Sequence, residues 1–120
     1  MADLRLQVLP FELDGRSYLL RCNMNVLAEA QEDLGGDLGG SITGKATMKS
    51  ILSFLAAMLN DYAEDMGWPE RYTRRELGKK FSFQDFTALP REEIMELVIN
   101  AVFLPNEELP EGQGENPEKN

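Results

Sequence analysis

Residues 48–66 carry the pattern that most limits how this chain can fold. Apolar side chains recur there at spacings of three and four over about five helical turns, as in a helix with one buried side. Thr47 or Thr43 can cap its start, and Gly67 and Pro69 follow its end. We therefore predict a long helix at the centre of one core. Its expected buried positions are Met48, Ile51, Leu52, Leu55, Met58, Leu59, Tyr62 and Met66.

A β-hairpin is predicted within residues 4–22. Asp14-Gly15 lies between two strand-like runs and is typical of a type I′ turn, which needs positive φ at both central residues. The apolar alternation changes parity after Pro10, so a bulge or break is expected there. A lone hairpin is marginal in water, so its apolar face must pack on helices. The predicted register pairs Leu13 with Arg16 and Phe11 with Tyr18, and the alternating positions before Pro10 are Leu4, Leu6 and Val8.

Another helix is predicted before the central one. It runs from Met24 to Leu34 behind an Asn23 cap and stops at Gly35-Gly36. A glycine-rich loop follows over residues 35–44. The expected buried face of this helix consists of Met24, Leu27, Ala28 and Leu34.

Two further helices are predicted after the central one. Thr73 and Glu76 form a capping box that opens a short helix. Pro90 suits the first turn of the last helix, because its φ is already helical. The linking segment between them contains Phe81, Phe83 and Phe86, which we expect to pack on the core. The buried stripe of the last helix is predicted to be Ile94, Leu97, Val98, Ala101 and Val102.

Together these elements predict a mainly helical α+β fold with an N-terminal β-hairpin packed on about four helices. A chain of 120 residues, 42% of them hydrophobic, can bury one core of ordinary size. We expect a single globular domain over residues 1–104. Residues 105–120 are rich in Pro, Gly, Glu and Asn and lack apolar periodicity, which predicts a disordered acidic tail.

Charge and reactive residue types narrow the function. The formal net charge of −9 disfavours a nucleic-acid partner, because phosphate backbones repel an acidic surface. The sequence has no histidine, the commonest general base and metal ligand, and its single cysteine, Cys22, rules out a thiolate zinc site. We therefore predict a protein that binds another protein and is not an enzyme, with no catalytic residue, metal or cofactor.

Two patterns with possible chemistry are better explained as ordinary structure. Residues 39–45 read G-x-x-x-x-G-K, but a phosphate-binding loop follows a buried strand and has a hydroxyl residue where this chain has Ala46. Asp61, Glu64 and Asp65 cluster near the end of the central helix, where a solvated helix surface is the usual explanation.

The sequence also predicts where the protein works. Its longest apolar stretch falls far short of the ~20 residues that cross a bilayer. The N-terminus lacks the basic and apolar regions of a signal peptide, and a lone cysteine fits a reducing compartment. We expect a cytoplasmic protein with no membrane partner.

Residues 11–18 read F-E-L-D-G-R-S-Y, and residues 24–27 read M-N-V-L. This order resembles the N-terminal region of small tail assembly chaperones from long-tailed bacteriophages and prophages, in which an F-x-L-D-G-x-x-Y hairpin runs into a helix. The later order is also similar: Tyr62-Ala63-Glu64 near a helix end, T-x-x-E-L-G at residues 73–78, a last apolar helix and an acidic tail. The resemblance covers about residues 10–104 and contains no catalytic signature.

The resemblance implies a function and partners. Such chaperones bind the tape-measure protein, whose long apolar helices would otherwise aggregate before the tail tube polymerises, and they help to recruit tail-tube subunits. The protein would then act in the cytoplasm of the bacterial host and be absent from the finished particle. The alternative is an acidic regulatory binding protein, either antitoxin-like or a nucleic-acid-mimic inhibitor. A mimic would spread carboxylates over a folded face.

Eight residues are the predicted partner-binding positions. A holdase needs limited exposed apolar surface, for which Leu38, Ile42 and Trp68 are candidates. Trp68 can equally cover the core, and Met48, Met58 and Met66 either fill the core or contact varied partners. The remaining five positions form a basic cluster, which is either a solvated surface or a docking site for an acidic partner. They are Arg71, Arg74, Arg75, Lys79 and Lys80.

Overall fold

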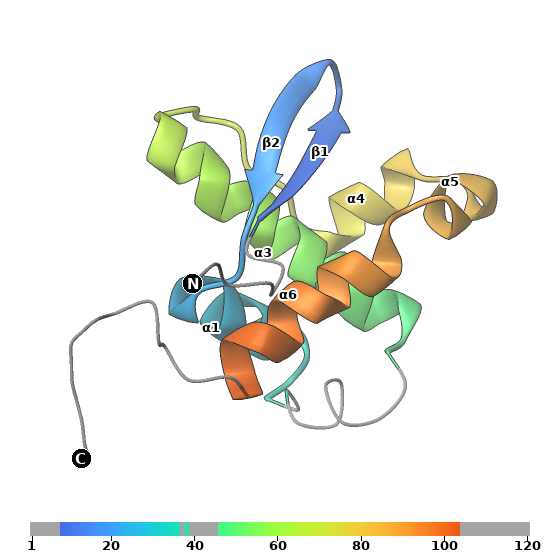
Figure 1. Cartoon of the computed structure of the whole chain (residues 1–120). Coiled ribbons are helices and arrows are strands. Elements are labelled where there is room, and N and C mark those ends of the chain that lie inside the picture. Colours follow the sequence, from blue (N-terminus) through green and yellow to red (C-terminus); the bar gives the residue numbers. More distant parts are fainter. Residues whose placement is uncertain (1–7, 37, 39–45, 104–120) are drawn as a thin grey trace, which may run out of the picture.

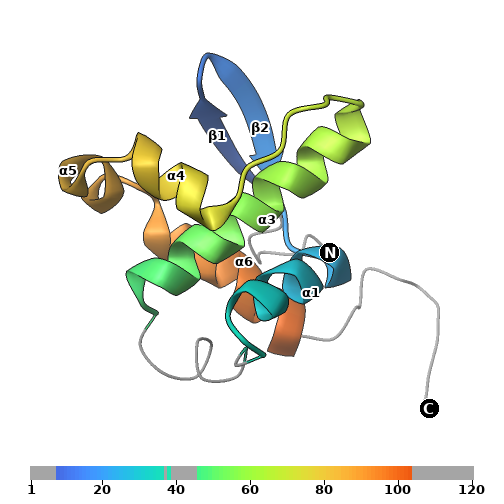
Figure 2. The same cartoon turned by 180° about the vertical axis from the view of Figure 1, so that it is seen from behind.

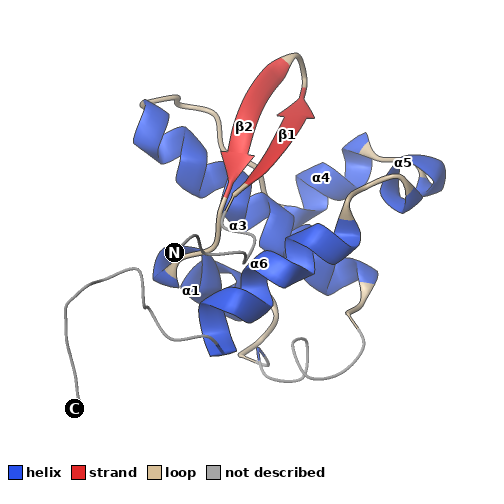
Figure 3. Cartoon of the chain, viewed as in Figure 1, coloured by secondary structure: helices blue, strands red, loops and turns tan. Residues whose placement is uncertain are grey.

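The computed structural model describes residues 8–36, 38 and 46–103, in which a two-stranded hairpin precedes five helices (Figures 1 and 3). This architecture confirms the predicted mainly helical α+β fold with an N-terminal hairpin. Predicted positions among residues 1–7, 39–45 and 104–120 lie outside the described residues. The elements are β1 (Leu9–Leu13), β2 (Arg16–Leu20), α1 (Met24–Asp33), α3 (Met48–Met66), α4 (Arg74–Lys80), α5 (Phe83–Thr87) and α6 (Arg91–Phe103).

Helix α3 is the centre of the fold, with the bounds predicted from the sequence. It contacts β2, α1, α4 and α6. Helix α6 lies on one side of α3 and α4 on the other, as the front and back views show (Figures 1 and 2). Residues 53–59 are therefore buried around the whole helix, including Ser53 and Ala56 outside the predicted stripe. Thr47 and Ser50 form a capping box at the start.

The hairpin has the predicted turn and register. Asp14 and Gly15 have φ values of 54° and 75°, and the strands pair antiparallel through Leu13–Arg16 and Phe11–Tyr18. The bulge or break expected at Pro10 is wrong, because β1 runs through this residue and pairs it with Leu19. Counting from the two-residue turn, this pair is a non-hydrogen-bonded one, so the missing N–H of proline costs no ladder bond.

Helix α1 has its predicted Asn23 cap, but its buried face is rotated. Val26, Leu27 and Ala30 are buried, whereas Met24 and Ala28 are exposed. In a helix of 10 residues, two overlapping apolar stripes are compatible with the sequence. Packing against α3 selects one of them.

The segment after α4 differs from the prediction. The expected linker contains a short helix, α5, capped by Ser82 with Asp85. Phe86 is buried and Phe81 packs against the core, but Phe83 is 72% exposed. The carbonyl of Pro90 accepts from the N–H of Ile94, which places Pro90 just before α6 and not in its first turn.

The buried stripe of α6 is shorter than predicted. Ile94, Leu97 and Val98 are buried, but Ala101 and Val102 are exposed. Packing on the core therefore buries the predicted stripe as far as Val98 and leaves its last two positions exposed.

Candidate partner-binding site

Trp68 follows directly after the end of α3. Gly67, at φ 75°, ends the helix, and the N–H groups of Gly67 and Trp68 donate to the carbonyls of Glu64 and Ala63 at 3.1 and 2.9 Å. This is a Schellman motif, in which the residue after the glycine usually makes an apolar contact with the last turn. Trp68 makes that contact with Tyr62, with 5.7 Å between the ring centroids.

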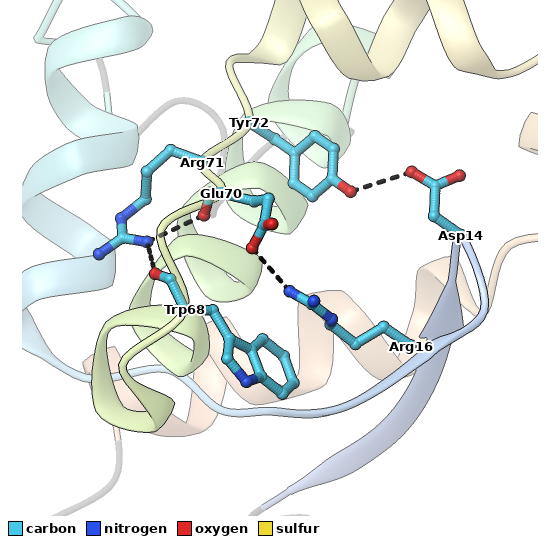
Figure 4. A network of polar contacts seen from close by, with 6 residues as sticks. All are labelled: Asp14, Arg16, Trp68, Glu70, Arg71 and Tyr72. Carbon is cyan, nitrogen blue, oxygen red and sulfur yellow. Dashed lines mark hydrogen bonds and ion pairs between the residues drawn. The ribbon is translucent and has the colours of Figure 1, made fainter.

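Trp68 joins the end of α3 to the hairpin. Its ring meets that of Tyr18 edge-on at 5.5 Å. The Arg16 guanidinium lies 4.2 Å from the centroid of the Trp68 ring, and Figure 4 shows these two side chains together. Arg16 donates to Glu70 at 2.7 Å. This ion pair lowers the pKa of Glu70 and raises that of Arg16. Trp68 is thus half-buried and covers the core, the second of its two predicted roles.

A second contact holds the turn of the hairpin. The Asp14 carboxylate accepts from the Tyr72 hydroxyl at 3.0 Å (Figure 4). It also accepts from Lys80 Nζ at 2.8 Å. The Lys80 ammonium lowers the pKa of Asp14, with a further contribution from Tyr72. Desolvation raises the pKa of Tyr72, and its hydrogen bond to Asp14 adds to the shift. The turn is therefore attached both to the segment after α3 and to the end of α4.

These contacts predict that the protein is less stable in acid. The pKa values of Asp14 and Glu70 are lowered in the folded state. At acidic pH the unfolded chain therefore binds protons at these two carboxylates more readily than the folded chain does. Their stabilising contribution is present above the unfolded values, near about pH 4, and is lost as pH falls through the lower folded values. Replacing both carboxylates (Asp14→Asn with Glu70→Gln) should flatten the pH dependence of the urea midpoint between about pH 6 and pH 3.

The matched control for this pH experiment is Glu12→Gln, which removes one exposed carboxylate of β1 without a described basic partner. Asparagine suits position 14 because it tolerates positive φ. If the double variant and the wild type lost stability equally over the acid range, these two carboxylates would not be the cause.

The predicted basic cluster is largely used inside the protein. Arg71 donates to the carbonyls of Trp68 and Glu70 at 2.6 and 2.9 Å, and Lys80 pairs with Asp14. Arg74 donates to Asp33 at 3.0 Å, and Ser53 donates to the same carboxylate. Only Arg75 and Lys79, one turn apart on α4, are exposed and form no hydrogen bond or ion pair within the part of the chain that the structure describes.

The apolar residues predicted to contact a partner differ in their burial. Leu38 is half-buried and packs against the core, and Ile42 lies outside the described residues. Met58 is fully buried, which is the core-filling role. Met48 and Met66 are exposed at the two ends of α3. Of the seven predicted positions that the structure describes, Leu38 and Trp68 pack against the core, and Arg71, Arg74 and Lys80 are held by contacts within the chain.

An apolar surface that the sequence did not predict lies on α6. Ile99, Val102 and Phe103 are 40%, 39% and 57% exposed, and the half-buried Met95 lies on the same side of the helix. We call these four residues the α6 strip. The sequence carried a signal for it, because apolar residues cover roughly two-thirds of the circumference of this helix at 100° per residue. In a helix with a single buried stripe, apolar residues occupy a much smaller part of the circumference.

A hollow continues the α6 strip toward the start of the helix. It has a volume of about 410 Å³, and Met95 belongs to both the strip and its lining. The other lining residues are apolar just before α3, on α3 and just before α6, and charged on the first turn of α6. They are Ala46, Ile51, Leu89, Pro90, Arg91, Glu92 and Glu93.

The cysteine thiol is shielded by burial, and two carboxylates near the end of α3 are paired. Burial raises the pKa of Cys22 to about 12, with Asp61 adding to the shift, so this thiol is protonated at neutral pH. Arg21 pairs with both Asp61 and Asp65. Within residues 8–36, 38 and 46–103, no three Cys, Asp or Glu side chains are grouped to hold a metal ion. Among the described helices, none is long and apolar enough to cross a membrane.

Comparison with known proteins adds no relative. No family model matches the chain, and no curated protein or solved structure shows significant similarity to it.

Proposed function

We propose that this protein is a tail assembly chaperone of a long-tailed bacteriophage or prophage, which binds the tape-measure protein and keeps it from aggregating during tail assembly. The observation that carries the proposal is the F-x-L-D-G-x-x-Y segment followed by M-N-x-L, a pattern resembling that family. In this chain the first segment forms the β1–β2 hairpin and the second begins α1. Tail-tube subunits are a second proposed partner, and the bacterial cytoplasm is the proposed compartment.

The surface of the protein supports a binding role. A holdase needs apolar side chains that remain available to a partner on an otherwise charged surface. The described residues include several large apolar side chains with such exposure: Met48, Met66, Phe83, Ile99, Val102 and Phe103. The net charge of −9 keeps such a chain from associating with itself.

The charge pattern counts against the alternative of a nucleic-acid mimic. A mimic needs unpaired carboxylates spread over a folded face. Here five carboxylates of the folded part pair with basic side chains of the same chain: Asp14, Asp33, Asp61, Asp65 and Glu70. An antitoxin-like binder would instead need an exposed surface for its toxin, and a toxin gene in place of a tape-measure gene beside this one would favour it.

Co-expression tests the proposal. The candidate tape-measure protein, a long helical protein from a neighbouring gene, is produced alone, with this chain, or with an unrelated acidic protein of similar size. We expect it to remain in the supernatant and to elute together with this chain only in the second case. A tape-measure protein that is equally insoluble in all three cases, with nothing co-purifying, would contradict the chaperone function.

A further inference from the structure

We propose that the α6 strip and the adjoining hollow are the docking site for one amphipathic helix whose apolar face is flanked by lysine or arginine. This inference rests on the proposed function, because it names the surface by which the chaperone would hold an apolar helix of its partner. The α6 strip, and not the predicted basic cluster, would then be the main contact with the partner.

The strip is apolar surface that the described part of the fold leaves partly exposed. Ile94, Leu97 and Val98 already bury one side of α6 against the core, so the fold itself does not use the second apolar side. A helix that is apolar around most of its circumference is normally covered on both sides. Ile99, Val102 and Phe103, with exposed fractions between 39% and 57%, lie within two turns of one another.

The shape of the surface fits an elongated ligand. Met95 joins the strip to the hollow of about 410 Å³, whose floor includes Ile51, Leu89 and Pro90. The whole surface follows α6, which is 13 residues or about 20 Å long. A partner helix of about four turns matches this length, and helices commonly dock on such surfaces through residues spaced three and four apart.

The charges around the strip select the partner. Glu92, Glu93 and Glu96 are exposed on α6, and Glu92 and Glu93 also line the hollow. The one cation of the helix, Arg91, lies 5.7 Å from the Phe86 ring centroid. A helix flanked by basic residues complements this acidic rim. A second copy of the chain has the same rim and the same net charge of −9, so it supplies no compensating charge.

Peptide binding to the full-length chain tests the site directly. The probe is a fluorescein-labelled amphipathic peptide of about six turns with a leucine face and lysine flanks. One comparison peptide has glutamate flanks, and another has the lysine sequence scrambled so that no apolar face forms. We expect anisotropy titrations to show binding of the first peptide only, with affinity that falls as salt rises.

Variants locate the binding on the strip. Ile99→Glu and Phe103→Glu should each weaken binding by about tenfold or more, because an apolar contact is replaced by a charge. Phe83→Glu is the matched control, since Phe83 is equally apolar and 72% exposed but lies on α5. Changing Glu92 and Glu96 together to lysine should shift the preference toward the glutamate-flanked peptide. Circular dichroism confirms that each variant is folded.

Several outcomes would overturn the docking site. Equal binding of the scrambled peptide would show attraction between charges alone, and equal loss with Phe83→Glu would exclude a local site. A dimer in sedimentation that Ile99→Glu converts to monomer would identify a second copy as the occupant. Co-expression separates the two proposals: a tape-measure protein kept soluble equally by wild type and Ile99→Glu leaves the chaperone function standing and removes the strip. Peptide binding at the strip without any effect on the solubility of the tape-measure protein would keep the docking site and remove the chaperone function.

Discussion

Replacing Trp68 with alanine should lower the free energy of unfolding by about 2–3 kcal/mol, less than the value for a fully buried tryptophan because this ring is half-buried. The substitution removes the edge-on contacts of the Trp68 ring with Tyr18 and Tyr62. It exposes the part of β2 that this ring covers. It also leaves the Arg16 guanidinium without the ring beneath it. Urea unfolding followed by circular dichroism measures the effect, since Trp68 is the only tryptophan and its fluorescence is lost in the variant.

Two other variants test the cause of this loss. Trp68→Phe retains an aromatic ring at the end of α3 and should recover more than half of the stability lost in Trp68→Ala. Met66→Ala removes an exposed apolar side chain two residues earlier and should change stability by less than about 0.5 kcal/mol. A Trp68→Ala variant as stable as Met66→Ala would show that the tryptophan does not hold the hairpin on α3.

Replacing Asn60 with alanine is expected to destabilise the protein by about 2–3 kcal/mol, because two backbone groups lose their partner at once. The Asn60 side chain accepts from the N–H of Tyr72 at 2.7 Å and donates to its carbonyl at 2.8 Å. It thereby attaches the segment after α3 to the side of that helix. Urea unfolding gives the global effect, and hydrogen exchange of the Tyr72 amide should accelerate more than that of amides within α3.

Controls for Asn60 separate its two hydrogen bonds to Tyr72 from a third one. The Asn60 amide also donates to Glu29 at 2.8 Å, at an exposed site. Glu29→Ala removes only this contact and should cost less than about 0.5 kcal/mol. Asn60→Asp keeps an acceptor for the Tyr72 N–H but cannot donate to its carbonyl, so it should remain destabilised. Unchanged exchange of the Tyr72 amide in Asn60→Ala would contradict the role assigned to this side chain.

Local signals in the sequence predicted most of the elements. The bounds of α3 follow from a repeat that continues for about five turns between a capping threonine and a glycine, so that no other helix register fits it. Asp14-Gly15 predicted the turn and the register, since few other residues adopt positive φ in succession. The Thr73–Glu76 capping box predicted the start of α4 for the same reason, because each signal acts within a few residues.

Errors arose where two local patterns compete. Helix α1 contains two overlapping apolar stripes, and α6 contains more apolar positions than one contact can bury. Ser82 with Asp85 is a capping pair that begins α5, whereas the neighbouring phenylalanines are equally compatible with an extended segment packed on the core. In each case the local sequence permits several answers with similar energies, and the helix that packs alongside decides between them.

The candidate site could be predicted least. Arg74 and Lys80 belong to a basic cluster in the sequence, but they pair with Asp33 and Asp14, which come 41 and 66 residues earlier in the chain. The sequence by itself determined the hairpin turn, the central helix and the caps, because those depend on φ preferences and on contacts between near neighbours. Only the tertiary structure decided that Trp68 covers the hairpin, that most of the basic cluster is paired, and that one side of α6 stays open. Burial and charge pairing depend on which distant segments meet, and no local pattern specifies that.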